Sequence, residues 1–189
     1  MIAPWFADRA RRTVRDQRES GQALVEFALV LLPLTIILFG IIQFGFLFGG
    51  QTGLVNAARE AARYAATLPA ANSTTTTVNA AKTLLELTEK ILPRSVPGYL
   101  GPSNLVTTGA GSTAVCYIAY PNADGATYSV RVRVQIRYRH PLYIPIVGTI
   151  VDGIDGTSGD NAFTLAASEE MRVENPPLSA APTGLPTCP

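Results

Sequence analysis

The chain contains few of the residues that catalytic and metal sites usually need. Its 189 residues include one histidine, two cysteines and one tryptophan, and only 15% are charged. Two cysteines and one histidine are too few for a Cys/His zinc site. No signature of nucleophilic or acid-base catalysis surrounds His140. We therefore expect no metal ion, no cofactor and no enzymatic activity.

Excess charge of either sign is also missing. Fifteen basic and 14 acidic residues give a formal net charge of +1. The chain as a whole therefore has no electrostatic attraction to nucleic acid or acidic substrates, and any such partner must be recognised locally. Nearly half of the residues, 47%, are hydrophobic, which instead indicates a membrane segment.

An apolar run without a charged residue extends from Phe27 to Ala58, about 32 positions where a bilayer needs about 20. Only Arg59 and Arg63 follow closely, whereas five arginines precede the run: Arg9, Arg11, Arg12, Arg15 and Arg18. Because basic flanks stay in the cytoplasm, we expect a single-pass protein with its N-terminus inside and the remaining chain exported.

A cleaved secretory signal is the alternative for this segment. The apolar region of such a signal is about 7 to 15 residues long and precedes a small-residue cleavage site. Here the run is about twice that length. No clean site follows it, although the Ala57-Ala58 and Ala65-Ala66 pairs keep the alternative open.

Glu26 is the acidic residue at the start of the apolar segment. A carboxylate in hydrocarbon costs several kcal/mol unless it is paired or neutralised, so Glu26 is a functional candidate, although it could also lie hydrated among the headgroups. A cut after Gly21 would make Gln22 the new N-terminus, one helical turn before Glu26. The carboxylate could then pair with the amine of a neighbouring subunit.

Two motifs extend this pattern over about 45 residues. The first is the Gly21/Gln22 junction with Glu26-Phe27 and an apolar helix containing Pro33, and the second is Asn56-Ala-Ala-Arg-Glu-Ala-Ala-Arg63. Together they resemble the TadE-like pseudopilins of tight-adherence (Tad, Flp-type) type IV pilus systems. The stretch 167–174 resembles the closing strand of that family more weakly.

The resemblance implies a structural protein whose leader is removed by prepilin peptidase at the cytoplasmic face of the membrane. It implies processing roles for Gly21 and Gln22 and assembly roles for Glu26 and Phe27. The implied partners are the peptidase, other pilins or pseudopilins, and the Tad assembly machinery. A major Flp pilin lacks a sizeable exported domain, so the chain resembles a minor pseudopilin of pilus assembly and adhesion, located in the cytoplasmic (inner) membrane and, after processing, at the cell surface.

The composition divides the chain into three parts. Residues 1–21 form a basic cytoplasmic leader, residues 22–68 a long helix that is transmembrane in its first half, and residues 69–189 an exported domain with a proline-rich tail. The helix itself is predicted over 23–68, about 45 residues, and ends before Pro69.

Small residues recur every fourth position along this helix, which extends a GxxxG motif into a ridge: Gly45, Gly49, Gly53, Ala57, Ala61 and Ala65. We assign the three glycines to contacts between subunits during assembly. The alanines fit packing within the same domain equally well.

The exported part predicts a small α+β domain in which an antiparallel sheet packs on the outer half of the long helix, as in type IV pilins. We expect strands at 114–120 and 128–138, joined by a turn, and a last strand at about 162–173. A short helix is predicted over 78–92, with an inward face formed by Val78, Ala81, Leu85, Thr88 and Leu92.

Arginines alternate with apolar residues along the second strand, so one face carries Arg131, Arg133, Arg137 and Arg139. Their spacing of about 6.6 Å is close to that of phosphates in extended nucleic acid. An alternative function is therefore a membrane-anchored module that binds DNA or an anionic surface polymer. A solvated face, partly neutralised by Glu169, Glu170 and Glu174, is favoured over this reading.

The two cysteines, Cys116 and Cys188, both lie in the exported part. In an oxidising compartment they predict one disulfide that anchors the tail. Free thiols or pairing with another subunit remain alternatives, because Cys188 is next to the last residue. A glycine-rich acidic loop at 152–161 does not have EF-hand spacing, so we expect no calcium there.

Overall fold

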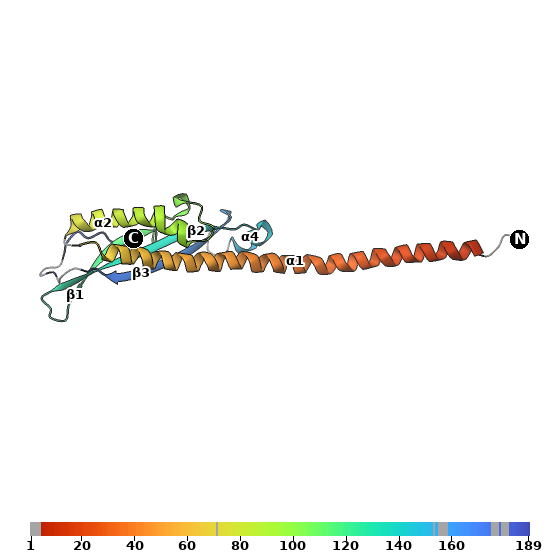
Figure 1. Cartoon of the computed structure of the whole chain (residues 1–189), viewed down its shortest axis with the longest axis horizontal. Coiled ribbons are helices and arrows are strands. Elements are labelled where there is room, and N and C mark those ends of the chain that lie inside the picture. The colour runs from red at the N-terminus through yellow and green to blue at the C-terminus, as the bar shows by residue number, and fades with distance from the viewer. Residues whose placement is uncertain (1–4, 71, 153, 155–158, 175–177, 179–181) are drawn as a thin grey trace. The chain divides into compact units, whose positions relative to one another are not determined.

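The computed structural model describes residues 5–70, 72–152, 154, 159–174, 178 and 182–189, without the side chains of residues 5–20 and 146. In chain order the elements are α1 (Trp5–Ala66), α2 (Ser73–Glu86), a π-helical turn η1 (Leu87–Ile91), α3 (Leu92–Ser95), a 3-10 turn η2 (Pro102–Asn104), β1 (Ala114–Pro121), β2 (Tyr128–Pro141), α4 (Pro145–Val151) and β3 (Ala162–Arg172) (Figure 1). A long apolar helix with a small antiparallel sheet confirms the α+β class.

The chain divides into two compact units, residues 1–42 and residues 43–189. In the first, α1 begins at Trp5, so the part of the leader that the structure describes is helical as well. Every side chain from Gly21 to Leu34 is exposed. The stretch Gly21–Ala66 contains a window long and apolar enough to cross a bilayer, a test that a signal sequence near an N-terminus would also pass. The helix is therefore a candidate membrane anchor.

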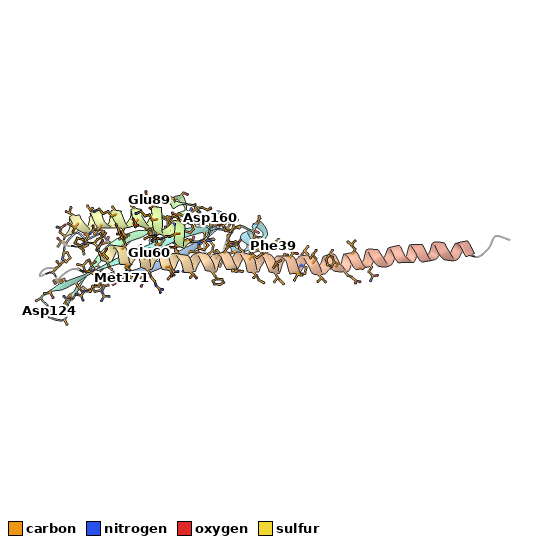
Figure 2. All side chains as sticks on the ribbon, in the orientation of Figure 1. Phe39, Glu60, Glu89, Asp124, Asp160 and Met171 are labelled. Atoms are coloured by element: carbon orange, nitrogen blue, oxygen red, sulfur yellow. A yellow bond between two sulfur atoms is a disulfide. The ribbon has the colours of Figure 1, made fainter. Side chains whose placement is uncertain are left out.

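The second unit is built around a three-stranded antiparallel sheet in the order β1-β2-β3. In its register, Val132 at the centre of β2 lies opposite Tyr117 of β1 and Met171 of β3. The expected strands and the hairpin turn are confirmed. The carboxylate of Asp124, at the tip of the hairpin in Figure 2, accepts hydrogen bonds from the backbone N–H groups of Ala126 and Thr127 at 3.1 and 3.0 Å.

The core of this unit lies between the sheet and the outer part of α1. The predicted alternation along β2 is confirmed, since its inward side chains are buried: Val130, Val132, Val134, Ile136 and Tyr138. The helix presents Leu54 and a face of small residues: Ala57, Ala58, Ala61, Ala62 and Ala65. Because alanine adds one methyl group, the helix backbone can lie close to the strands and still exclude water.

The helix that follows begins at Ser73, five residues before the expected start at Val78. Its first turn is held by a reciprocal capping box: Asn72 Oδ1 accepts the N–H of Thr75 at 2.9 Å, and Thr75 Oγ1 accepts the N–H of Asn72 at 3.1 Å. The polar stretch before Val78 is therefore part of α2.

The predicted inward face of this helix was wrong within α2, although its last member, Leu92, is buried as expected. Val78 and Leu85 are 47% and 56% exposed, whereas Thr76, Asn79 and Thr83 are buried. Each buried side chain donates to a backbone carbonyl at 2.8 to 3.0 Å, those of Asn72, Pro69 and Asn79 respectively. Because these local bonds satisfy the polar groups, threonine and asparagine can face the core at little cost.

The helical path also continues past the expected end at Leu92. Pro93 has no N–H, and its ring clashes with the carbonyl four residues earlier in a regular α-helix. The chain widens into η1 just before it, so that the N–H of Leu92 bonds to the carbonyl of Leu87, five residues back. The helix then proceeds through α3 to Ser95.

The C-terminal tail is attached to the outer edge of β1. Cys116 and Cys188 form a disulfide with their Cα atoms 5.3 Å apart, which confirms the intrachain pairing. Beside it, the N–H of Tyr117 donates to the carbonyl of Pro186 at 2.9 Å, and that of Gly111 to Pro189 at 3.2 Å. The tail therefore pairs with an edge that β2 leaves open.

We expect the double substitution Cys116→Ser/Cys188→Ser to lower the free energy of unfolding of the full chain. The bond closes a loop with a sequence separation of 72, for which the chain-entropy model gives about 4 kcal/mol. Denaturant unfolding in detergent, followed by circular dichroism, measures the change, and wild-type protein with a reductant is the matched control. Equal midpoints for oxidised and substituted protein would contradict a stabilising disulfide.

Candidate functional site

The predicted junction lies within α1 at the start of the apolar segment. A Cβ atom added at Gly21 would meet nothing within 4 Å, so the backbone there is open to an incoming protein. One turn later, Gln22 Nε2 donates to Glu26 Oε1 at 2.9 Å. Residue 22 therefore already places a nitrogen beside this carboxylate in the uncut chain.

Glu26 is surrounded along the helix by exposed apolar side chains, among them Leu24, Val25, Phe27 and Val30. In lipid, such a face requires a charged group to find a partner or to lie at the membrane surface. Gln22 supplies one polar contact and leaves the other carboxylate oxygen without a hydrogen bond among the described residues. The second carboxylate oxygen is thus open to a further hydrogen-bond donor.

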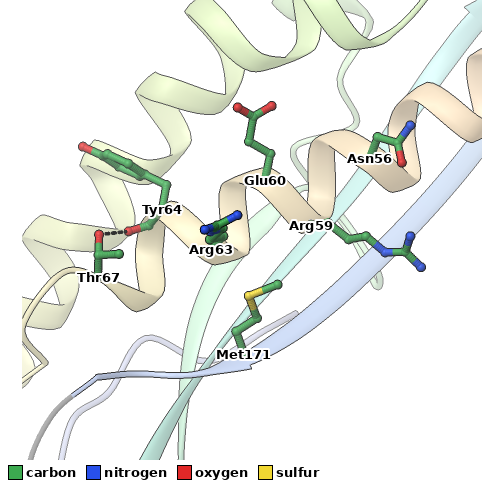
Figure 3. Close-up of a pocket in the computed structure, with 7 residues that line it drawn as sticks. All are labelled: Asn56, Arg59, Glu60, Arg63, Tyr64, Thr67 and Met171. Carbon is green, nitrogen blue, oxygen red and sulfur yellow. Dashed lines mark hydrogen bonds between the residues drawn. The ribbon is translucent and has the colours of Figure 1, made fainter.

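The second motif is divided by the helical period into two faces. Its alanines, at 57, 58, 61 and 62, belong to the core described above. Its polar residues face outward and line an open depression of about 700 Å³, which β3 closes on one side through Met171 (Figure 3). The full lining is Asn56, Arg59, Glu60, Arg63, Tyr64, Thr67 and Met171.

Ion pairs join this face to its neighbours. Arg59 Nε lies 3.7 Å from Glu169 Oε2 of β3, and Glu60 pairs with Arg94 of α3. Exposed pairs of this kind stabilise a fold by about 1 kcal/mol or less. The motif therefore contributes a packed face and a charged face to the same helix.

Residues 21–63 match the family model described as TadE-like protein. The chain carries a TadE-like segment. This confirms the resemblance found in the sequence, and the matched residues include both motifs. No curated protein and no solved structure matches the chain.

The predicted glycine ridge of the TadE-like segment has different surroundings at each position. Gly45 has open space where a Cβ would lie, and at Gly49 a Cβ would be in ordinary contact with Pro97, at 3.8 Å. At Gly53 a Cβ would lie 2.9 Å from the carbonyl carbon of Ser95 and closer still to its oxygen. The close approach at Gly53 is thus made to α3 within the domain, and Gly45 and Gly49 stay predicted contacts between subunits.

The arginine row is largely engaged by acidic groups of the same chain. Glu170 of β3 accepts hydrogen bonds from Arg131 at 3.3 Å and from Arg133 at 3.2 and 2.8 Å. Burial alone would raise the pKa of Glu170, but the bonds from the two arginines outweigh it and hold that pKa below its usual value. Arg131 also lies 4.7 Å from the ring centroid of Tyr120, a partner that sequence reasoning missed.

Further along the row, Arg139 Nε lies 3.9 Å from Asp160 Oδ2, and Arg137 donates to the carbonyl of Ala110 at 3.2 Å. The geometry therefore favours a neutralised strand face over a phosphate-binding row. Residues 153 and 155–158 of the acidic loop lie outside the described part of the chain. Within that part, no three His, Cys, Asp or Glu side chains gather as metal ligands would.

Sequence reasoning missed a polar cluster where α1 enters the second unit. Gln43 is fully buried, and its Oε1 accepts the N–H groups of Tyr143 and Ile144 at 3.0 and 3.1 Å. His140 is also fully buried, and its Nε2 atom lies 3.1 Å from the carbonyl oxygen of Pro97. The signal that could have found it is the position of Gln43, the one polar side chain between Thr35 and Gln51.

We expect Gly53→Ala to destabilise the domain by about 1 to 3 kcal/mol, because the added methyl group overpacks against Ser95. The matched control is Gly45→Ala, which adds the same group to the same helix in open space and should leave the free energy of unfolding unchanged or slightly higher. Thermal unfolding of both full-length variants measures the difference. Equal unfolding temperatures would show that Gly53 does not require its small size for packing within the chain.

Proposed function

We propose that the protein is a minor pseudopilin of a Tad-type pilus, cut after Gly21 by prepilin peptidase and acting in pilus assembly and adhesion. The observation that carries the proposal is the TadE-like match, which begins at Gly21 and contains the entire apolar segment. TadE-like proteins form a structural, pilin-type family. The proposed role is accordingly structural and has no catalytic step.

In the proposed mechanism, the basic leader remains in the cytoplasm and the apolar part of α1 holds the precursor in the membrane. Peptide-bond cleavage after Gly21 creates a positively charged amine at Gln22. Glu26 then neutralises the amine of a neighbouring subunit, so both charges can enter an apolar helix bundle as a pair. Phe27 and the small residues at 45 and 49 add apolar contact and close approach between helices.

Export of residues 43–189 is supported by the Cys116–Cys188 disulfide, because such bonds persist in oxidising compartments and are rare in the cytosol. The proposed partners follow from this topology. They are the prepilin peptidase on the cytoplasmic side, other pilins or pseudopilins within the membrane, and the Tad assembly machinery that moves processed subunits into the fibre.

We expect a mature chain beginning at Gln22 only when the cognate prepilin peptidase is co-expressed, as measured by intact mass and N-terminal sequencing. Gly21→Leu should preserve the leader, because a bulky side chain obstructs the backbone that a protease must hold extended. Gly45→Ala, a change at another exposed helical glycine, is the control and should be processed normally. A chain that keeps Met1 with the active peptidase would overturn the processing claim, and cleavage after the apolar run would identify a secretory signal.

We expect Glu26→Ala to be cleaved normally and to enter the fibre poorly. An unpaired amine inside an apolar bundle costs about 3 to 5 kcal/mol, so incorporation should fall by on the order of a hundredfold or more. Quantitative immunoblotting of sheared pili against the membrane fraction measures the ratio of assembled to cleaved protein. Glu89→Ala removes an exposed carboxylate from η1 and serves as the matched control. Wild-type incorporation of the Glu26 variant would exclude the pairing role.

A further inference from the structure

One end of the second unit is apolar and carries no charge over two separate segments. Residues 141–151, which include α4, contain no charged side chain, and neither do residues 43–58 of α1. Ile150 and Ile154 are each 68% exposed, and Phe48 is 71% exposed. Phe44, Phe46 and Tyr143 are also exposed. We call these six residues the apolar end.

The apolar end is held in place by folded structure. A second small core packs Leu47 of α1 against Leu142, Val147 and Val151. The amide oxygen of Gln43 binds the two N–H groups that lead into α4, as described above. The rings of Phe46 and Tyr143 lie 5.3 Å apart, and the hydroxyl of Tyr143 donates to the carbonyl of Gly98 at 3.2 Å. The exposed isoleucines and phenylalanines therefore stand on an anchored surface.

A groove runs through the same region, with a volume of about 360 Å³. Its walls are almost entirely apolar, and the residues that form them include Phe44, Phe48, Val151, Ile154 and Phe163. A surface of this composition fits acyl chains and the apolar part of the interfacial region better than water.

The position of the apolar end along α1 decides which occupant fits. A bilayer core takes about 20 helical residues, and counting from Phe27, the first residue after Glu26, reaches Phe46. The far membrane surface therefore falls among the aromatic residues at 44, 46 and 48. Aromatic side chains are enriched at that depth because one part of the ring lies in hydrocarbon and its edge meets the headgroups.

We propose that the apolar end is seated in the outer interfacial region of the lipid bilayer while the protein is still in the membrane. The proposal rests on α1 spanning the membrane, which is part of the proposed function. α4 and Ile154 then dip beside α1 into the headgroup layer. The apolar end then fixes the height of the domain above the membrane. The β1–β2 hairpin lies at the other end of the domain (Figure 1).

The test uses the full-length protein in phosphatidylcholine vesicles that contain brominated lipids, which quench tryptophan fluorescence on contact. Trp5→Phe removes the one native tryptophan, and single tryptophans are then placed at Phe48 or Ile150. The matched control is Val78→Trp, at an exposed apolar site of α2 near the other end of α1, where Asn79 binds the carbonyl of Pro69. We expect quenching at both test sites to be about threefold stronger than at the control, because interfacial tryptophans lie at headgroup depth.

A further variant separates this inference from the anchor on which it rests. Leu34→Trp lies in the middle of the apolar run and should be quenched by lipids brominated deep in the chain. If Leu34→Trp is quenched and Phe48→Trp and Ile150→Trp behave like Val78→Trp, the apolar end is not in lipid and the inference fails while the anchor stands. If Leu34→Trp is not quenched, the anchor itself fails. If the two test tryptophans are not quenched by lipid but become less accessible to water as the protein density in the vesicles rises, the surface is covered by a second copy of the chain. That result would overturn the proposal.

Discussion

The close approach of α1 to the inner face of the sheet is the constraint on which the domain depends. One face of the helix consists mostly of alanine, and its buried residues share one hydrophobic core cluster with the inward side chains of β2. Replacing these alanines by larger residues would separate the layers and open the core. The same small-residue spacing continues toward the candidate membrane segment, where Gly53 and Gly49 lie near Ser95 and Pro97 and Gly45 faces open space.

This constraint divides a single helix between two environments. From Gly21 to Ile42 nearly all side chains are exposed, and the apolar composition makes this part of the helix a candidate membrane anchor. From Gln43 onward the helix is one wall of a folded domain. The change occurs at Gln43, whose buried amide links α1 to the segment before α4. A polar side chain in an otherwise apolar stretch thus marks where the domain begins.

The sequence could predict those elements in which apolar and polar residues alternate with the period of the secondary structure, or in which turn-forming residues stand between two such elements. Strict alternation along β2 located the strand and its buried face, and the asparagine, aspartate and glycine between the strands located the hairpin turn. The inward face of α2 was missed because the hydroxyl groups of Thr76 and Thr83 donate hydrogen bonds to nearby backbone carbonyls and can therefore be buried. A prediction that assumes apolar residues face the core then selects the wrong face of the helix. The contact of Gly53 with Ser95 joins residues distant in sequence, and no local pattern encodes it.

The attachment of the tail to β1 also limits how such molecules can associate. A free sheet edge is a template for β-augmentation, in which one chain adds a strand to the next. Here the backbone of Pro186 and the disulfide at Cys188 occupy that edge of β1 with the chain's own residues. The chain's own tail therefore hinders the addition of a strand from another molecule at this edge of β1.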